Sequence, residues 1–398
     1  MGTPSKSVPE ANALTRRFQA FFESEKSGGI LLMVCTAASL LLANSAFGVG
    51  YLAFWQTPMV GMSVEHWIND AGMAIFFLLI GLELERELYS GELSSFRNAL
   101  LPVIAAVGGV LAPALIHFAL NVGTPTQPGL GIPMATDIAF AIAALAILGS
   151  RVPPSLKVFV VAFAVMDDLL AIIVIAVFYT AKIQVVYLAG AMAIFVALCA
   201  LNRFGRLKAL TPYLLCGVVM WYLMYQSGVH ATIAGVLVAF AIPFSAREED
   251  QHSPSHRLEM MLHKPVAFVI LPLFALANTA IVVSAGWQQA LISPNSLGIL
   301  AGLLLGKPLG ITVFCFVAVA VGLCRLPDTL NWHHVWGAGL LGGIGFTMSI
   351  FIANLAFAGQ ADMVNTSKMA VLLGSLSAGL AGLVWLGLWG RAQQYRHF

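Results

Sequence analysis

Charged side chains are scarce in this sequence. Asp, Glu, Lys and Arg together make up 10% of its 398 residues, and 59% of the residues are hydrophobic. A soluble domain carries about 25% charged residues. The formal net charge is +2, and the charges lie in short connectors without forming a basic stripe, which gives no indication of nucleic-acid binding. The composition instead indicates an integral membrane protein.

Cysteine is scarce as well, and none of the five cysteines forms a CxxC pair. This spacing argues against a disulfide framework and against a cysteine-based metal site. All five lie in or beside apolar runs, where a free cysteine packs as a small hydrophobic residue. They are Cys35, Cys199, Cys216, Cys315 and Cys324. We expect no cofactor.

Long apolar runs are abundant. A helix needs about 20 apolar residues to cross a bilayer, and this reading gives twelve candidate segments. They are 28–47, 66–84, 99–120, 130–149, 156–179, 184–202, 209–226, 228–243, 262–284, 296–323, 334–357 and 367–389. The eighth is short, and the fourth and eleventh are interrupted. We predict one all-α membrane domain over residues 1–398, with a surface-lying amphipathic helix at about 12–26.

The distribution of Lys and Arg predicts the orientation of the spans. With both termini in the cytoplasm, 17 of the 20 basic residues fall in cytoplasmic segments. Only Lys182 and Lys368 fall on the outer side, and Lys307 lies within an apolar segment. Because basic residues accumulate on the cytoplasmic side of membrane proteins, we expect twelve transmembrane helices with both ends inside.

Four charged residues lie deep within apolar segments: Asp137, Asp167, Asp168 and Lys307. A charged side chain at the bilayer centre costs about 2.5 to 3.5 kcal/mol on insertion scales, so such residues usually face one another or a water-filled path. A structural ion pair between Lys307 and one aspartate would account for only two of them. We interpret the four residues as part of an ion or proton pathway.

Asp167 and Asp168 are adjacent in the run FAVMDDLLAIIVIAVF, residues 163–178. Neighbouring residues on a helix point about 100° apart, so the two side chains can straddle a seam between helices. Carboxylate oxygens suit a hard cation, while burial and mutual repulsion favour protonation. The pair can therefore hold protons or a metal cation, each excluding the other, which is the minimal chemistry of an antiporter.

The fourth segment contains residues that disfavour a continuous helix. Within GIPMATDIAFAIAALAIL, residues 131–148, Pro133 fixes its own φ and disfavours helix at Ile132. Thr136 and Asp137 supply oxygens just beyond it. We expect the helix to be interrupted here, inside the membrane.

The eleventh segment, WGAGLLGGIGFTMSIFIANLAF at residues 336–357, has three glycines within four positions, ending at Gly345. One glycine would indicate only close packing, whereas this cluster predicts an unwound centre. An interruption exposes the dipoles of two half-helices. Asp137 suits their positive N-terminal ends, and Lys307 suits their negative C-terminal ends.

The two interrupted segments are the middle members of two triplets of spans, at residues 99–179 and 296–389. Interrupted helices at matching positions predict an inverted repeat, with the two breaks crossing at mid-membrane. The repeat rests on this placement alone, because the two triplets have no clear sequence similarity.

Six stretches of the sequence carry a resemblance to a known family. They read INDAGMAIFFLLIGLELEREL, PMATDIAFAIAALAILGSRVP, VMDDLLAI, SGVHATIAGV, LLLGKPLGI and GGIGFTMSIFI. In these stretches, and over nearly all of its length, the chain resembles the NhaA-type Na+/H+ antiporters of bacterial inner membranes. The resemblance implies a non-enzymatic, multi-pass transporter that exports Na+ or Li+ in exchange for a larger number of entering protons.

The resemblance also implies roles for individual residues. Asp167 and Asp168 would bind the cation and the protons. The broken-helix crossing would hold Thr136, Asp137, Lys307 and Gly345. The candidates for pH sensing are Glu83, Arg86, Glu87, Glu259, His263 and His230.

Two departures from the family pattern put the pH set point in doubt. Glu85 stands where a base is expected, and Met260 stands where a histidine is frequent. The family further implies electrogenic exchange, activation at alkaline pH, roles in Na+ and pH homeostasis, and a homodimer in lipid. Residues 55–61 fit the short outer hairpin used for dimer contact, and Asp70 could draw cations in.

Two other classes of protein stay open on the residues alone. A sodium-coupled symporter of a small organic solute could use a similar fold, but it needs a polar solute cavity, and the deep polar groups here are few. An intramembrane aspartyl protease could use Asp137 and Asp168, but the GxGD pattern is absent and Asp167 and Lys307 would be unexplained.

Overall fold

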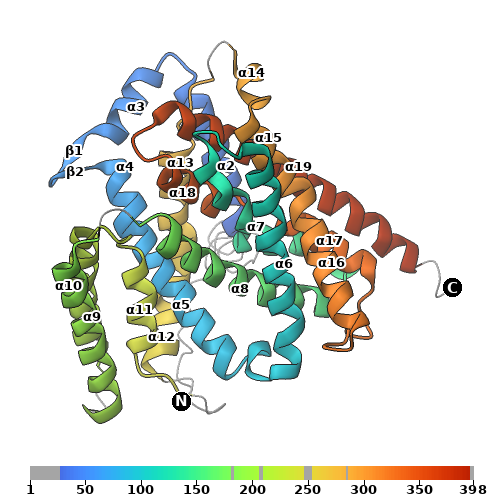
Figure 1. Ribbon diagram of the computed structural model, residues 1–398, viewed down its shortest axis with the longest axis horizontal. Helices are drawn as coiled ribbons and strands as arrows, with labels where there is room; N and C mark the ends of the chain where they lie inside the picture. Colours follow the sequence, from blue (N-terminus) through green and yellow to red (C-terminus); the bar gives the residue numbers. More distant parts are fainter. Residues whose placement is uncertain (1–26, 181–182, 206–208, 246–252, 284–285, 395–398) are drawn as a thin grey trace, which may run out of the picture.

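The protein is almost entirely helical (Figure 1). The computed structural model describes residues 27–394 except 181–182, 206–208, 246–252 and 284–285, so the expected surface helix at residues 12–26 lies outside the described residues. The first part of the chain forms α2 (Ser27–Ala43), α3 (Gly48–Gln56), β1 (Pro58–Met59), β2 (Met62–Ser63), α4 (Val64–Trp67), η1 (Ile68–Gly72) and α5 (Met73–Tyr89).

The middle of the chain contains the predicted first triplet and the segments that follow it. Its elements are η2 (Glu92–Ser94), α6 (Phe96–Asn121), η3 (Gln127–Met134), α7 (Ile138–Leu148), η4 (Gly149–Arg151), α8 (Pro154–Phe178), α9 (Val185–Ala200), η5 (Leu201–Gly205), α10 (Leu210–Ser227) and α11 (Ile233–Ala241). The last part forms α12 (Pro254–Pro265), η6 (Val266–Ile270), α13 (Leu271–Asn278), α14 (Trp287–Leu291), α15 (Pro294–Ala301), η7 (Gly302–Gly306), α16 (Lys307–Ala320), α17 (Trp332–Gly342), α18 (Phe346–Ala356) and α19 (Ala361–Gln394).

Many of these helices are long and apolar enough to cross a membrane. Among the described residues, eight qualify alone, and two bent pairs, α2 with α3 and α17 with α18, raise the number to ten. The eight are 64–89, 98–121, 127–151, 154–178, 185–204, 254–278, 294–320 and 361–389. The chain is thus an all-α, multi-pass membrane protein, and the count of twelve stays a prediction.

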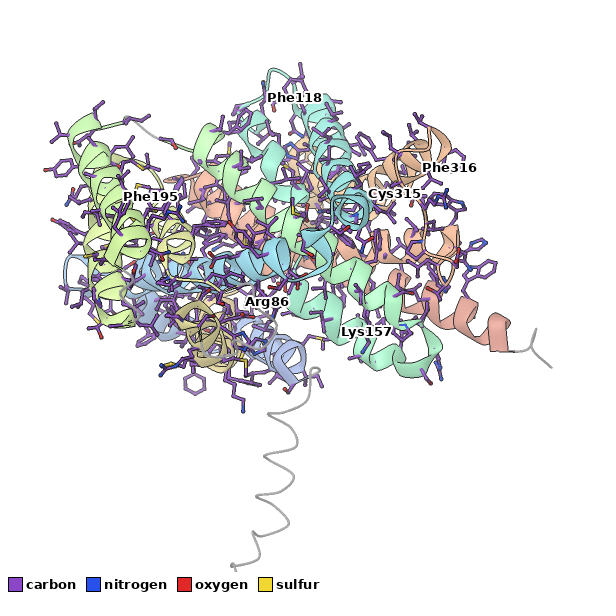
Figure 2. All side chains as sticks on the ribbon, turned by 90° about the horizontal axis from the view of Figure 1, so that it is seen from below. Arg86, Phe118, Lys157, Phe195, Cys315 and Phe316 are labelled. Atoms are coloured by element: carbon purple, nitrogen blue, oxygen red, sulfur yellow. The ribbon has the colours of Figure 1, made fainter. Side chains whose placement is uncertain are left out.

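The helices are arranged around a central group that contains α2, α7 and α18 (Figure 1). At one end of the long axis, α9 and α10 pack together beside α11, which packs on α5. At the other end, α6, α16, α17 and α19 pack against one another. Figure 2 shows the same separation, with Phe195 of α9 far from Cys315 and Phe316 of α16. The central group lies between these two ends.

Close packing of α6 against α16 depends on two glycines. A Cβ added at Gly108 would collide with the carbonyl oxygen of Gly310, and one added at Gly310 would collide with that of Gly108. Small residues allow membrane helices to approach until their backbones touch. The contact fixes the start of α16, where Lys307 lies three residues before Gly310.

The α-helix of the fourth segment begins only at Ile138, after the residues that the sequence predicted to interrupt it. Ile132 and Pro133 belong to the 3₁₀ helix η3, which continues to Met134. The chain becomes extended only at Ala135, with φ −80° and ψ 150°, and α7 begins at Ile138. The φ that proline fixes, about −65°, lies within the range of a 3₁₀ helix. The non-helical stretch, residues 135–137, therefore includes Thr136 and Asp137.

The eleventh segment consists of α17 and α18, which meet at a bend of 48°. Residues 343–345 separate them. The hairpin expected near residues 55–61 is formed by β1 and β2, with Pro58 paired to Ser63 and Met59 to Met62. All five cysteines are free.

Candidate functional site

The buried end of the site is an ion pair between α8 and α16. The Lys307 ammonium lies 2.6 Å from Oδ2 of Asp167, and both side chains are 0% exposed. Further hydrogen bonds to the remaining polar atoms offset the cost of burying an ion pair, although Oδ1 of Asp167 has no partner among the described residues. Lys307 has such a bond, because it also donates to the Thr136 hydroxyl at 2.9 Å.

Thr136 connects this ion pair to the end of α17. Its hydroxyl accepts from Lys307 and donates to the carbonyl oxygen of Gly342 at 2.8 Å. Gly342 is the last residue of α17, so its carbonyl belongs to the negative end of that helix. A chain of two hydrogen bonds, through the Thr136 hydroxyl, therefore links the Lys307 ammonium to the C-terminal end of α17.

Asp137 lies at the N-terminal ends of two helices. As the N-cap of α7 it accepts a hydrogen bond from the backbone N–H of Phe140 at 3.3 Å. Its other carboxylate oxygen accepts from the backbone N–H and the hydroxyl of Thr347, in the first turn of α18, at 3.1 and 2.5 Å. A carboxylate at a helix N-terminus satisfies free N–H groups and the positive end of the dipole, and here one carboxylate serves two helices.

The two non-helical stretches also touch directly. The backbone N–H of Asp137 donates to the carbonyl oxygen of Ile344 at 2.6 Å, which joins residues 135–137 to residues 343–345. Gly345 is needed at this contact, because a Cβ there would collide with the Ser349 hydroxyl and lie 3.0 Å from the carbonyl oxygen of Ala135. The four deep charges, Thr136 and Gly345 are thus gathered where α7, α8, α16, α17 and α18 meet.

Asp168, unlike Asp167, faces open space. It lines a cavity of about 520 Å³ together with Thr136, Asp137 and Thr347. Its side chain is 1% exposed, and its Oδ1 atom has no hydrogen-bond partner among the described residues. A buried carboxylate oxygen without a partner is costly unless a ligand satisfies it. The cavity leads toward the surface past Glu83 and the exposed His263.

An acid–base cluster lies near the mouth of this cavity, where the end of α5 meets α12. Arg86 forms an ion pair with Glu259 at 2.7 Å and a weaker one with Glu87 at 3.4 Å. His256 lies 3.7 Å from the same Glu259 carboxylate. Arg86 is labelled in Figure 2, which views the molecule from the side of α12. The structure therefore brings Arg86, Glu87 and Glu259 together, with Glu83 and His263 beside them on the cavity wall.

His256 was not considered from the sequence, and Glu85 was noted there only as a departure from the family pattern. Glu85 is 5% exposed and accepts a hydrogen bond from the Ser255 hydroxyl at 3.0 Å, so this acid in the place of a base is buried against α12. His256 belongs to the acid–base cluster. The spacing of His256 and Glu259 at i and i+3 on one helix was the available signal. Met260, in contrast, is 66% exposed.

Two further candidates lie away from the cluster. His230 shares a hydrogen bond of 2.8 Å with the backbone carbonyl oxygen of Tyr179, at the end of α8. Asp70 pairs with His66 at 3.2 Å near the start of the α4–α5 span. The structure brings neither residue to the ion pair or to the acid–base cluster.

The chain was compared with known protein families. The model of the family described as Na+/H+ antiporter 1 matches residues 19–386. The chain belongs to this family. The family's members are transporters rather than enzymes, so the prediction of an NhaA-type transporter is confirmed, and neither the symporter nor the protease alternative gains support.

Curated relatives of this family cover nearly the whole chain. A Na+/H+ antiporter NhaA of Dechloromonas aromatica is 65% identical over 373 residues, which is 94% of this chain and 96% of that protein. One of Cytophaga hutchinsonii is 56% identical over 94% of this chain and 95% of its own length. One of Helicobacter pylori is 42% identical over 94% of this chain and 96% of its own length. The similarity therefore extends over the whole site described above.

Proposed function

We infer that this protein is a Na+/H+ antiporter, in which Asp168 and Asp167 bind Na+ or Li+ and release protons. The observation that carries this inference is the unpartnered Asp168 oxygen on the cavity wall, beside an Asp167–Lys307 ion pair without solvent exposure. A cation that enters the cavity meets carboxylate and hydroxyl oxygens, which are the ligands that hard cations prefer. The same oxygens hold protons when the cation is absent.

Separation of the Asp167–Lys307 ion pair is a second step of the exchange, after the cation has reached Asp168. For Asp167 to become a full cation ligand, its carboxylate must leave the Lys307 ammonium, because both compete for Oδ2. An arriving cation at Asp168 favours this separation, since it repels the ammonium. In the structure the Thr136 hydroxyl oxygen accepts a hydrogen bond from Lys307, and once Lys307 has moved away this oxygen can turn toward the cation. Na+ binding and the release of Lys307 are thereby coupled.

The number of protonatable groups supports electrogenic exchange. Asp168, Asp167 and Lys307 can together release more than one proton when one monovalent cation binds. Two entering protons for each exported Na+ would move one net charge inward per cycle. We propose that the membrane potential therefore drives the export of Na+.

Activation at alkaline pH follows from the same competition. At low pH, protons occupy the carboxylates and exclude Na+, and deprotonation at higher pH frees the site. The cluster of Arg86, Glu87 and Glu259 near the cavity mouth carries both signs of charge, so its protonation alters the field at the cavity. We propose that this cluster, with Glu83, His263 and His230, sets the pH of activation and that the protein serves Na+ and pH homeostasis.

The proposed topology completes this assignment. Twelve spans with both termini in the cytoplasm of a bacterial inner membrane place the cavity mouth on the cytoplasmic side, and the interrupted segments cross at its inner end. The first triplet at residues 99–179 and the second at 296–389 would be inverted repeats. The β1–β2 hairpin, whose turn residue Val60 is 85% exposed, would contact a second copy of the chain in a lipid-embedded homodimer.

Everted membrane vesicles test the exchange directly. The vesicles are acid-loaded, a pH-sensitive dye reports their interior, and NaCl, LiCl, KCl or an organic solute is added outside. We expect NaCl and LiCl alone to drive proton efflux. A dye signal with KCl of equal size, or one that needs an organic solute, would contradict the assignment.

A further inference from the structure

A second buried polar cluster is separate from the cation site and is centred on Asn278. This side chain is 1% exposed and ends α13. Its Nδ2 donates to Asn69 at 2.6 Å, and its Oδ1 accepts from Asn354 at 2.6 Å and from the Lys368 ammonium at 3.3 Å. Lys368 is 5% exposed and lies 3.7 Å from Glu65. We call Asn278, Asn69, Asn354 and Lys368 the asparagine clasp.

The clasp lies at the opposite end of the molecule from the cavity mouth. Asn69 belongs to η1, which is continuous with α5, and Arg86 of the mouth follows 17 residues later along this span. At 1.5 Å per residue the two positions are about 25 Å apart, which is most of the thickness of a bilayer core. Figure 1 shows α4, α13 and α18 gathered on one side and α12 with the end of α5 on the other.

Each element of the clasp also reaches the cation site. On α18, Thr347 binds Asp137, and Asn354 lies two turns further along. On α13, Leu271 lines the cavity, and the helix ends at Asn278. The span that holds Asn69 carries Glu83 of the cavity wall.

The same holds for α19, whose Ser375 accepts a hydrogen bond from the backbone N–H of Phe346 at 3.1 Å. Lys368 lies two turns before Ser375 on this helix. Three of the four elements, α5, α13 and α18, therefore line the cavity on one side of the cation site, and all four are bonded together on the other.

Buried aromatic side chains lie between the clasp residues and the cavity residues along α5, α13 and α18. The rings of Phe77 and Phe351 lie 5.8 Å apart, and each side chain is 1% exposed. Phe274, one turn before Asn278, is 0% exposed. A hydrated cation cannot pass this apolar layer unless the elements that carry it separate. The clasp holds three of these elements, α5, α13 and α18, together.

We propose that the asparagine clasp is the closed gate on the side of the protein opposite the cavity, and that it must open for a cation to exchange with that side. The proposal rests on the exchange function inferred above. Removing Asn278 breaks the contacts of all four elements at once, so it should increase the population of the state that is open on the Lys368 side. An apparent affinity is reduced in proportion to the population of the competent state, so the change should appear on one side only.

The test compares Na+ exchange from the two faces of the protein. Acid-loaded everted vesicles and acid-loaded right-side-out vesicles receive external NaCl, and the half-saturating Na+ concentration is measured in each. For Asn278→Ala we expect this concentration to fall by about 3- to 10-fold on the Lys368 side. On the cavity side it should rise by less than about twofold, because a state that is already dominant loses little of its population.

Asn121→Ala is a matched control. Asn121 is also 0% exposed, donates to the carbonyl oxygens of His117 and Pro294, and accepts from Thr126, and none of these partners belongs to the clasp. The Asn121→Ala variant should have a lower melting temperature, but its half-saturating Na+ concentration should not change on one face more than on the other. Asn354→Ala replaces Asn278→Ala in the test if the latter fails to fold. It removes a half-buried side chain that forms a single bond within the clasp, so the same difference between the faces is expected, but smaller.

Two results would overturn the gate. In the clasp variants, half-saturating concentrations that change equally on both faces, or on neither, would reduce the clasp to a packing contact. If the parent protein shows no Na+-driven proton movement in either kind of vesicle, both the exchange function and the gate are refuted. If the parent exchanges normally and a clasp variant changes equally on both faces, only the gate proposal is refuted.

Discussion

Asp137 and Thr347 join the two interrupted segments through one carboxylate oxygen. The backbone N–H and the hydroxyl of Thr347 both donate to Oδ2 of Asp137, while Oδ1 receives the N–H of Phe140. One negative charge thus balances the N-terminal ends of α7 and α18. The Thr347 hydroxyl is the part of this arrangement that can be removed without moving the backbone.

Thr347→Val should weaken cation binding at the crossing more than it slows transport. The substitution removes the hydroxyl donor and leaves the backbone N–H in place, so Asp137 loses one of its hydrogen bonds. We expect the half-saturating Na+ concentration in everted vesicles to rise about 3- to 10-fold, as one lost hydrogen bond implies, with the maximal rate within about twofold. Thr312→Val is the control, because the buried Thr312 hydroxyl has no partner among the described residues. An equal rise in both variants would contradict the role of Thr347.

Asp167→Asn and Asp168→Asn should both stop Na+-driven proton movement but differ in stability. Asp168 is an unpaired buried carboxylate, so its neutralisation removes a cost. Asp167→Asn leaves the Lys307 ammonium buried without its partner, which costs about 3 kcal/mol of unfolding free energy. Melting temperatures of the two purified variants check this. Equal melting temperatures would mean that the ion pair does not stabilise the fold, and exchange in either variant would move the cation site elsewhere.

The deep charges and the positions of the spans could be predicted from the sequence because each rests on a strong local signal. An aspartate or a lysine in an apolar run is conspicuous, and apolar runs of this length form helices in a membrane. The family resemblance rested on motifs around the same residues, and the family model confirmed it.

Contacts between distant segments could not be predicted in the same way. Asp167 was indistinguishable from Asp168 in sequence, and only the packing of α16 on α6 brings Lys307 to one of them. The 3₁₀ helix that contains Pro133 could not be predicted, because the proline signals only that an α-helix is disfavoured there. Asn278, Asn69 and Asn354 gave no signal, because neutral amides far apart in the chain do not reveal that they meet.

Removal of either charge of the Arg86–Glu259 ion pair should shift the pH dependence of exchange in opposite directions. Without the Arg86 cation, acids at the cavity mouth keep their protons to a higher pH, so Arg86→Gln should move the activity profile toward alkaline pH. Glu259→Gln removes a negative charge and should move it toward acidic pH. We expect shifts of about 0.5 to 1 pH unit, with partial cancellation in the double variant. Exchange rates in everted vesicles between pH 6 and pH 9 check this, and unshifted profiles would exclude the pair from pH sensing.

Lys307→Met should make the stability of the protein fall as pH rises. Methionine keeps much of the volume of lysine, but Asp167 then has no cation beside it and remains protonated in the folded state. The unfolded chain loses that proton above the ordinary range of an aspartic acid. The unfolding free energy of this variant should therefore fall, relative to the parent, by about 1.4 kcal/mol per pH unit until Asp167 ionises in the fold.

Thermal unfolding of the purified variant at several pH values measures this slope. The double variant Lys307→Met/Asp167→Asn has no proton to hold at this position, so its unfolding free energy should follow the pH dependence of the parent. Lys307→Arg keeps the charge and should unfold with the pH dependence of the parent, although its guanidinium cannot lose a proton at physiological pH. If Lys307→Met unfolds with the same pH dependence as the parent, Lys307 is not the group that keeps Asp167 ionised, and the coupling of Na+ binding to its release would have to be abandoned.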